Sequence, residues 1–424
     1  MRTDVLVIGG GLSGLCAALG AQKSGARTAV LASGMGVLYL SSGCIDLMAY
    51  PGGRGGEPVG SPLEAIAGIG NESPEHPYAS IDDQDLRRAL DSFVRACGRQ
   101  DLHMAGDGTK NFRIPTALGT YRPTAIVPHT MVKGDLLDRA PMTLIGFLGF
   151  RDFFAELAAA EINIGFGIET RSVVFDPSSL MGGRTINTVS LGRAFEDLKF
   201  CEGLARFINR EVGRDMRVGL PATLGVDGAS MAHKSLEELT ARPIFEIPIL
   251  PPSLPGRRIY QALKREFFEQ GGQLITGCPV LKADTENRRV KSIAYKAGEV
   301  GRKSIEAKAF VLATGSYFSG GLVCKRDSIV EPIFGLSIRD EPAVRDRYAP
   351  DFLAAKGHPI GKAGVRIAKD FRPCNQGREA VYENLFACGD VVGGFDSLLE
   401  RSGGGVAVAS GILAGEGAVK AAEK

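Results

Sequence analysis

The sequence contains no tryptophan, has only five histidines among 424 residues, and carries almost no net charge. Its 50 lysines and arginines balance 48 aspartates and glutamates, which leaves a formal charge of +2. Without tryptophan, no indole ring can serve as a stacking platform. Balanced charge provides no basis for nucleic-acid binding or for electrostatic attraction to a membrane, so we expect no nucleic-acid partner.

Metal-binding patterns are also lacking. The eight cysteines are scattered without a CxxC pair, and the five histidines show no ligand spacing. This pattern argues against a zinc site or an iron–sulfur cluster in the chain, so we expect no metal. Scattered thiols of this kind are typical of a reducing, cytosolic compartment.

Long apolar segments are the third absence. No uninterrupted apolar run reaches the ~18 residues that a membrane span needs. The N-terminal stretch lacks the basic region of a signal peptide and carries Asp4 before its first apolar run. We therefore expect a soluble, cytoplasmic protein without a direct membrane span.

The first 33 residues hold the clearest pattern in the sequence. An apolar run at 4–8 predicts a buried strand, and GGGLSG follows at once. Leucines then recur at helical spacing as far as Lys23, Gly25 ends the helix, and 28–32 predicts a second strand. Strand, glycine turn, helix and strand in this order form the unit that holds a nucleotide phosphate.

Each glycine of this turn has a physical reason. Gly9 allows the tight turn, Gly11 lets the backbone approach phosphate oxygens, and Gly14 lets the helix pack close to the strand. Leu12 and Ser13 begin the helix, where free N–H groups carry partial positive charge and face the anion. We expect these five residues to bind a cofactor.

One part of the dinucleotide fingerprint is missing. An aspartate or glutamate normally ends the second strand and holds the adenosine ribose. Here that end reads Ala32-Ser33-Gly34, and the next carboxylate is Asp46. The gap weakens NAD as the ligand and leaves FAD and a shorter mononucleotide open.

Four later segments fit contacts to a flavin. The stretch LYLSSGCIDL suggests that Ser41, Ser42 and Gly43 lie beside the isoalloxazine ring, although a plain Ser-Gly turn is the alternative. A helix ending in Gly271-Gly272, a strand, a hairpin and a strand ending in ATG follow in order. That order predicts backbone contact from Val280 near the base and from the three residues Ala313, Thr314 and Gly315 near the phosphates.

The C-terminal part completes the expected site. A strand leads into Gly389-Asp390, where an aspartate can accept hydrogen bonds from ribityl hydroxyls. A helix of small residues then opens with Gly403, Gly404, Gly405 and Val406. Its positive end would stabilise negative charge on the reduced pyrimidine ring by about 1 kcal/mol.

These motifs predict an α/β fold. We expect a Rossmann-like FAD/NAD(P)-binding domain of the glutathione-reductase and fumarate-reductase type with an inserted α+β cap domain. The flavin domain would be discontinuous, over residues 1–70, 251–325 and 376–424. Residues 71–250 and 326–375 would form the inserted domain for capping or interaction.

Several stretches together resemble the B subunit of anaerobic glycerol-3-phosphate dehydrogenase, within the fumarate-reductase-like superfamily. The resemblance runs from residue 1 to the last helix and is weakest in 151–245. It is carried by SSGCIDL, SPEHPY, LGTYRPT, LPPSLPGRRIYQALKREFFEQGG, VLATGSYFSGGLVCKRDSIVEPIFGL, NLFACGDVVGGFD and SGGGVAVASG.

The resemblance implies a flavin-dependent protein that works beside an FAD-bearing catalytic A subunit and an iron–sulfur, membrane-docking C subunit. It implies oxidation of sn-glycerol 3-phosphate to dihydroxyacetone phosphate, electron transfer to a quinone, and a peripheral position on the inner face of the cell membrane. The family is described with FMN on the B subunit, while the fold also allows FAD.

Arg122, in the stretch LGTYRPT, is the candidate catalytic residue, with a structural salt bridge as its alternative role. Two other functions stay open on the sequence: a stand-alone flavin oxidoreductase with its own substrate, and a flavin-free scaffold within the complex.

Overall fold

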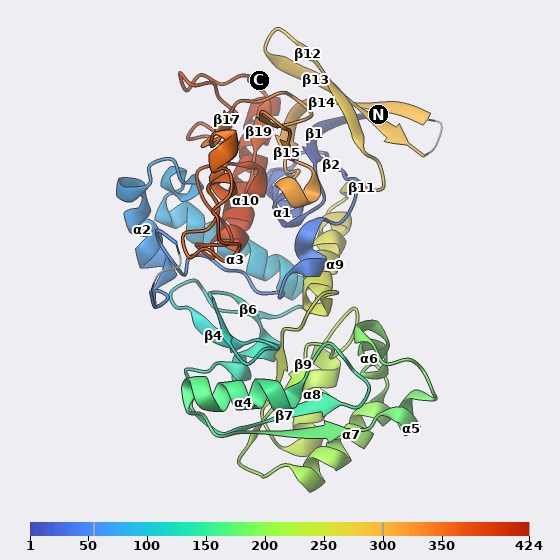
Figure 1. Cartoon of the computed structure of the whole chain (residues 1–424). Helices are drawn as coiled ribbons and strands as arrows, with labels where there is room; N and C mark the ends of the chain where they lie inside the picture. The colour runs from blue at the N-terminus through green and yellow to red at the C-terminus, as the bar shows by residue number, and fades with distance from the viewer. Residues whose placement is uncertain (54–55, 299–300, 424) are drawn as a thin grey trace.

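The computed structural model describes residues 1–53, 56–298 and 301–423, and the five remaining positions, which fall in segments expected for the flavin domain, lie outside the described residues. The chain forms two lobes (Figure 1). The lobe at the top contains both ends of the described chain, while the green segments form the lobe at the bottom.

The upper lobe is built on a seven-stranded sheet. Its order is β11-β2-β1-β14-β13-β12, and β19 pairs with the last residues of β14. The strands β11, β2, β1, β14 and β19 run parallel, whereas β12 and β13 form an antiparallel hairpin beside the first half of β14. The bounds are β1 (Arg2–Ile8), β2 (Thr28–Leu31), β11 (Gln273–Ile275), β12 (Val280–Glu286), β13 (Arg289–Ala297), β14 (Gly301–Leu312) and β19 (Leu385–Ala387).

Five long helices belong to this lobe, and two of them cross at unusually short range. A Cβ on Gly415 would lie 2.1 Å from the carbonyl oxygen of Ala17, and one on Gly20 would lie 2.5 Å from that of Ile412. Glycine is therefore required where α1 and α10 touch backbone to backbone. The helices are α1 (Leu12–Lys23), α2 (Pro62–Glu72), α3 (Asp83–Arg99), α9 (Leu254–Glu269) and α10 (Gly403–Ala422).

The helix α10 is long and apolar enough to cross a bilayer, and it alone among the described residues meets both criteria. In the fold it lies against α1, with 61% of its most apolar window buried inside the protein. That burial is what the central helix of a water-soluble fold also shows.

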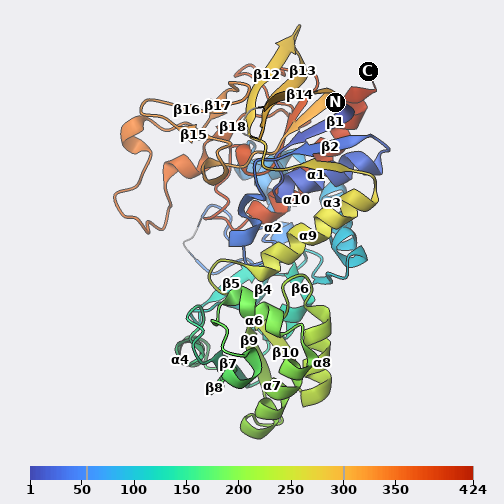
Figure 2. The ribbon, with the colours of Figure 1, turned by 90° about the vertical axis from the view of Figure 1, so that its right-hand side faces the viewer.

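The lower lobe has its own sheet and core. Its four strands run parallel in the order β10-β9-β7-β8, with helices packed against them (Figure 2). The core is rich in phenylalanine, including Phe147, Phe195 and Phe245. The elements are β7 (Met142–Phe147), α4 (Ala155–Phe166), β8 (Thr170–Phe175), α5 (Ser178–Met181), α6 (Thr188–Ala194), α7 (Leu198–Glu211), β9 (Arg217–Pro221), α8 (Ser230–Thr240) and β10 (Ile244–Ile247).

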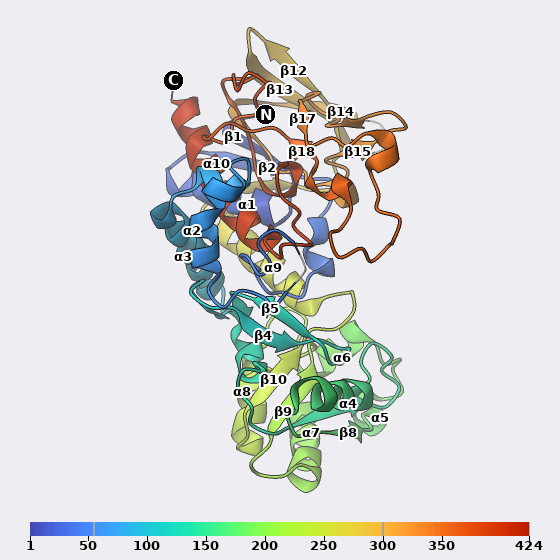
Figure 3. The same ribbon diagram turned by 60° about the vertical axis from the view of Figure 1, so that its left-hand side comes forward.

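Short antiparallel pairs complete the structure. Two of them lie where the lobes meet, and two lie in the loops that follow β14 (Figure 3). They comprise β3 (Met104–Ala105) with β6 (Val127–Pro128), β4 (Phe112–Pro115) with β5 (Tyr121–Thr124), β15 (Val323–Cys324) with β16 (Ile329–Val330), and β17 (Ile338–Arg339) with β18 (Gly364–Val365).

The expected domain boundaries differ from this packing in two places. Residues 326–375, assigned to the insert, pack in the upper lobe, where Leu336 and Val365 share a core with Leu6. The helix α3, also assigned to the insert, packs its apolar face in the core that contains Val406 of α10. A charged, loop-rich segment such as 326–375 gives no periodic pattern that would reveal which core its few apolar residues join.

The crossing of α1 and α10 generates a stability prediction. Gly415→Ala should lower the free energy of unfolding by about 2 kcal/mol or more, because the new methyl group would overlap the Ala17 carbonyl. Chemical denaturation monitored by circular dichroism measures this. The matched control is Gly68→Ala in α2, where a Cβ meets nothing within 4 Å and the change should stabilise by about 0.5–1 kcal/mol. Equal effects of the two substitutions would contradict the packing argument.

Candidate functional site

The turn after β1 is closed by contacts that leave no room for side chains. Gly9 has a φ of +120°, and a Cβ there would lie 2.1 Å from the carbonyl oxygen of Ala313. A Cβ on Gly14 would lie 2.0 Å from the carbonyl oxygen of Gly9. These two glycines are therefore needed by the protein's own packing.

Gly11 differs from its neighbours because nothing in the described part of the chain requires it to be glycine. It precedes α1 with a φ of −80°, and the nearest atom to a Cβ there would be 3.9 Å away, at Gly36. No side chain caps the helix, so the N–H groups at Leu12 and Ser13 begin α1 without a capping acceptor among the described residues. Open space beside uncapped N–H groups is what an incoming phosphate needs.

The segment after β14 lies directly beside this turn. The N–H of Ala313 donates to the carbonyl of Ile8 at 2.8 Å. The hydroxyl of Thr314 is buried with no hydrogen-bond partner in the described part of the chain. Gly315 follows with a φ of +73°. An unpaired buried hydroxyl is costly, which fits a ligand atom at this position.

The Gly-Asp pair follows β19 on the other side of α1. A Cβ on Gly389 would lie 2.4 Å from the hydroxyl of Ser13, and the N–H of Gly389 donates to the hydroxyl of Ser410 at 3.0 Å. Burial raises the pKa of the Asp390 carboxyl to about 6; Asp396 also raises it, whereas a hydrogen bond from Ser397 opposes the shift. A desolvated carboxylate of this kind is stabilised by further hydrogen-bond donors.

The first turn of α10 completes the arrangement. Its N-cap Ser402 makes no side-chain capping bond to the helix. Gly403 faces Asp390, with 3.7 Å between its would-be Cβ and a carboxylate oxygen, and a Cβ on Gly404 would lie 3.0 Å from the backbone nitrogen of Asp46. Val406 is fully buried beneath this turn.

Gly405 shows why the start of α10 must be glycine-rich. A Cβ there would lie 2.2 Å from the hydroxyl of Tyr78. Its N–H donates to the carbonyl of Asp46 at 2.8 Å, so the loop containing SSGCIDL is tied to the helix start.

Arg122 lies in β5 and forms a two-pronged ion pair with Asp46. Its Nε donates to Oδ1 at 3.1 Å and its Nη2 donates to Oδ2. The side chain of Asp46 is 6% exposed and that of Arg122 is 25% exposed, so water reaches the pair mainly from the arginine side. Nη1 of Arg122 has no acceptor in the described part of the chain, which leaves it able to contact another group.

Behind α10 lies a polar network that the sequence patterns do not predict. The imidazole Nδ1 of His76 accepts from the N–H of Tyr78 at 3.0 Å, which assigns the ring proton to Nε2. Nε2 then donates to the Glu400 carboxylate at 3.0 Å, and the hydroxyl of Ser402 donates to the same carboxylate. His76 and Tyr78 lie in the stretch SPEHPY, which supported the family resemblance but did not reveal that His76 pairs with Glu400.

The remaining residues expected to contact the cofactor differ: some have side-chain groups free for a ligand, and others are used within the protein. The hydroxyl of Ser41 is used locally, donating to the Leu38 carbonyl at 2.8 Å, whereas that of Ser42 accepts from the Cys44 N–H and keeps its own proton for another partner. A Cβ on Gly43 would lie 2.3 Å from that of Pro255, in α9. Val280 begins β12 at half-buried exposure.

The end of β2 lacks a carboxylate in the structure as well. Ala32 bonds to Ile275 and Cys278 of the neighbouring segment, and Ser33 is exposed. Asp46 cannot serve as the ribose anchor because it faces Arg122 and α10 instead.

A family model and curated relatives match the chain over nearly its whole length. A family model described as an FAD binding domain matches residues 4–406. The chain is 31% identical to the B subunit of anaerobic glycerol-3-phosphate dehydrogenase from Aliivibrio fischeri, covering 99% of this chain and 96% of the relative. The same protein from Vibrio vulnificus is 32% identical, with 98% and 95% covered.

Among solved structures, an open conformation of a flavocytochrome c3 fumarate reductase covers 100% of this chain and 79% of its own, with a TM-score of 0.46 and 12% identity.

The residues present fit a flavin. The free space at Gly11, the unpaired Thr314 hydroxyl and the desolvated Asp390 carboxylate would each gain a partner from a bound phosphate or ribityl chain. The family match confirms the expected α/β flavin-binding fold class and the expected flavin, as FAD or FMN. The chain therefore belongs to the FAD-binding-domain flavoproteins and, within them, to the family of the B subunit of anaerobic glycerol-3-phosphate dehydrogenase.

Proposed function

We propose that the chain is the flavin-bearing B subunit of a complex that oxidises sn-glycerol 3-phosphate to dihydroxyacetone phosphate. Electrons would pass through an iron–sulfur C subunit to a quinone, with an FAD-bearing A subunit beside it. The observation that carries this proposal is the similarity, over nearly the whole length, to relatives named for that dehydrogenase. The complex would lie in the cytoplasm, on the inner face of the cell membrane.

In this proposal, segments from distant parts of the chain hold the cofactor. The turn from Gly9 to Gly14 binds phosphate with the help of Ala313, Thr314 and Gly315. Asp390 accepts hydrogen bonds from ribityl hydroxyls, while Gly403, Gly404, Gly405 and Val406 border the ring together with Ser42 and Gly43. Val280 contacts the base if the cofactor extends that far. A bound flavin supplies the chemistry of hydride acceptance.

The chain's own contribution is electrostatic. The start of α10, which no described side chain caps, would direct partial positive charge at the pyrimidine side of a flavin ring held there. Arg122, fixed by Asp46, can direct its Nη1 to the phosphate of the substrate, and the ion pair prevents the side chain from leaving its place.

The electron path separates this proposal from the alternatives. We expect the purified flavin-loaded chain alone not to reduce an artificial dye with sn-glycerol 3-phosphate, and the chain reconstituted with the A and C subunits to reduce it. Turnover by the chain alone would favour a stand-alone oxidoreductase. A colourless chain that still assembles an active complex would favour a scaffold. Chromatography of the cofactor released by denaturation identifies it as FMN or FAD.

Gly11 permits a direct test of the phosphate site. Gly11→Ala should leave the free energy of unfolding of the flavin-free protein unchanged within about 0.5 kcal/mol, because its methyl group has space and its φ suits alanine. Flavin affinity, measured by fluorescence titration, should fall about tenfold or more because the methyl group occupies the path of the phosphate. Gly14→Ala is the contrast and should destabilise the protein itself. Unchanged affinity in Gly11→Ala would argue against phosphate binding at this turn.

Asp390 should show opposite effects on stability and on binding. Its folded pKa of about 6 lies above the ordinary value of 3.8, so its contribution to stability is lost as pH rises from about 4 to about 6. Flavin-free Asp390→Asn should therefore be more stable than the parent by about 1–2 kcal/mol at pH 7 and equal to it near pH 4. Flavin affinity should fall about tenfold, because an amide accepts hydrogen bonds less strongly than a carboxylate. A stability difference independent of pH would refute this account.

A further inference from the structure

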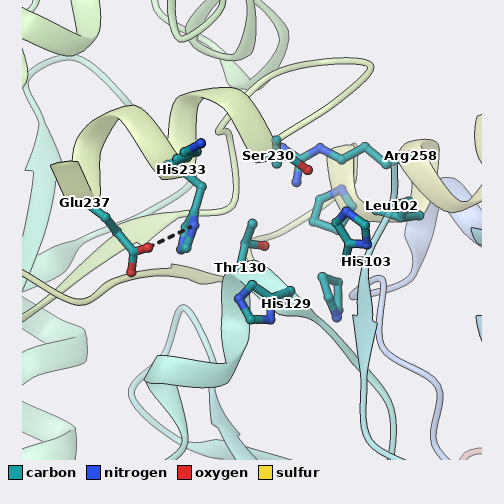
Figure 4. A pocket seen from close by; sticks show the side chains of 12 residues that line it. Leu102, His103, His129, Thr130, Ser230, His233, Glu237 and Arg258 are labelled. Carbon is teal, nitrogen blue, oxygen red and sulfur yellow. Dashed lines mark ion pairs between the residues drawn. The ribbon is translucent and has the colours of Figure 1, made fainter. Parts of the chain in front are cut away.

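A cavity of about 250 Å³ lies where the two lobes meet. Four segments distant in sequence form its walls (Figure 4). They are the loop after α3 with His103, the start of a 3-10 helix with His129, the first two turns of α8 with Ser230, and the start of α9 with Arg258. None of these four residues belongs to the flavin site.

The helix α8 presents hydrogen-bond donors to the cavity. It begins at Ser230 after Ala229, and no side chain caps it. Ser230 and Ala229 both line the cavity, so the N–H groups of this first turn border it. By contrast, α7 is capped by the Asp197 carboxylate, which accepts from the N–H of Lys199.

Two cations reinforce the donors of α8. Lys234, one turn into the helix, is exposed and only weakly held by Glu238 at 3.8 Å. Arg258 is 2% exposed, and Glu246 and the carbonyl of Gly225 accept four of its five N–H groups. The second N–H of Nη1 has no acceptor within the described ranges. The buried Glu246 carboxylate balances the charge of Arg258, so the guanidinium offers an anion this one N–H, held in a fixed orientation.

Histidines line the rest of the cavity. The rings of His129 and His233 lie edge to face with centroids 6.3 Å apart, and the backbone N–H of His129 donates to the carbonyl of His103. Nε2 of His233 donates to the carbonyl of Ile244 at 2.9 Å, so its Nδ1 faces Glu237 at 3.7 Å. Figure 4 marks this pair at the side of the cavity opposite Arg258.

The set of side chains favours an anion over a metal. Within residues 1–53, 56–298 and 301–423, no group of three or more His, Cys, Asp or Glu side chains is placed to hold a metal ion. Uncapped N–H groups, a lysine, an arginine and imidazoles are the donors that phosphate sites use. Glu237 is the one carboxylate that lines the cavity among the described residues, and it sits on the second turn of α8, away from the helix start.

We propose that this cavity binds a small soluble phosphate compound at the junction of the lobes, held by the start of α8, Lys234, Arg258 and His129. Pro255 lines the cavity and also packs against Gly43, so an occupant contacts the residue that supports the loop beside the flavin ring. The proposed site is separate from the proposed oxidation. A phosphate compound bound there would change the surroundings of the flavin.

The experiment is calorimetric titration of the flavin-loaded full chain with inorganic phosphate, since bound flavin keeps the probe out of the glycine turn. We expect binding with a dissociation constant on the order of 1 mM or tighter. Lys234→Ala should weaken it roughly fivefold, whereas Glu237→Gln should strengthen it severalfold by removing a like charge. Lys199→Ala, at the capped start of α7, is the matched control and should change nothing.

Several results would overturn the proposal. They are no binding up to about 10 mM phosphate, equal affinity in the three variants, and acetate binding as tightly as phosphate. Because Glu237→Gln is expected to raise affinity, a variant that merely misfolds cannot imitate the expected pattern. The proposed oxidation is tested separately by dye reduction in the reconstituted complex, so either proposal can fail without the other.

Discussion

This structure depends on close backbone contacts among the turn after β1, the end of β14, α1 and α10. The turn after β1 touches the end of β14, α1 touches that turn, and α10 touches α1, in each case at glycines whose added Cβ would lie within about 2.6 Å of a carbonyl or main-chain atom. Such contacts bring three helix or strand ends to one point. The proposed cofactor site follows from that convergence, because within the described residues the starts of α1 and α10 contribute N–H groups without a side-chain cap and the segment after β14 contributes the unpaired Thr314 hydroxyl.

Behind this convergence, a shell of polar side chains keeps the start of α10 in place. Asp46 accepts from Gly405 through its backbone while its carboxylate holds Arg122. The Glu400 carboxylate, just before this helix, accepts hydrogen bonds from His76 and Ser402. The Asp46 carbonyl and the Glu400 carboxylate thus both secure this helix end, and no described side chain caps it, so the N–H groups of Gly403 and Gly404 stay available to a ligand.

Local pattern was enough to predict much of the upper lobe. The strand at 4–8, the helix to Lys23 and the strand at 273–275 appear in the structure as β1, α1 and β11, because glycine placement and apolar periodicity are short-range signals. Three long-range features were not predicted from the sequence. Asp46 pairs with Arg122, His76 bonds to Glu400, and residues 326–375 join the upper core. Each depends on which segments pack together, and residue spacing does not encode that.

The contact between α1 and α10 also has a consequence for folding during synthesis of the chain. On the ribosome, α1 emerges nearly four hundred residues before α10, so the part of α1 that packs against α10 stays uncovered until then, although β1, β2 and α9 can pack against α1 earlier. The lower lobe, which has its own sheet and core, is made entirely within this interval. The residues that we propose to border the flavin ring therefore come together only when α10 has been made.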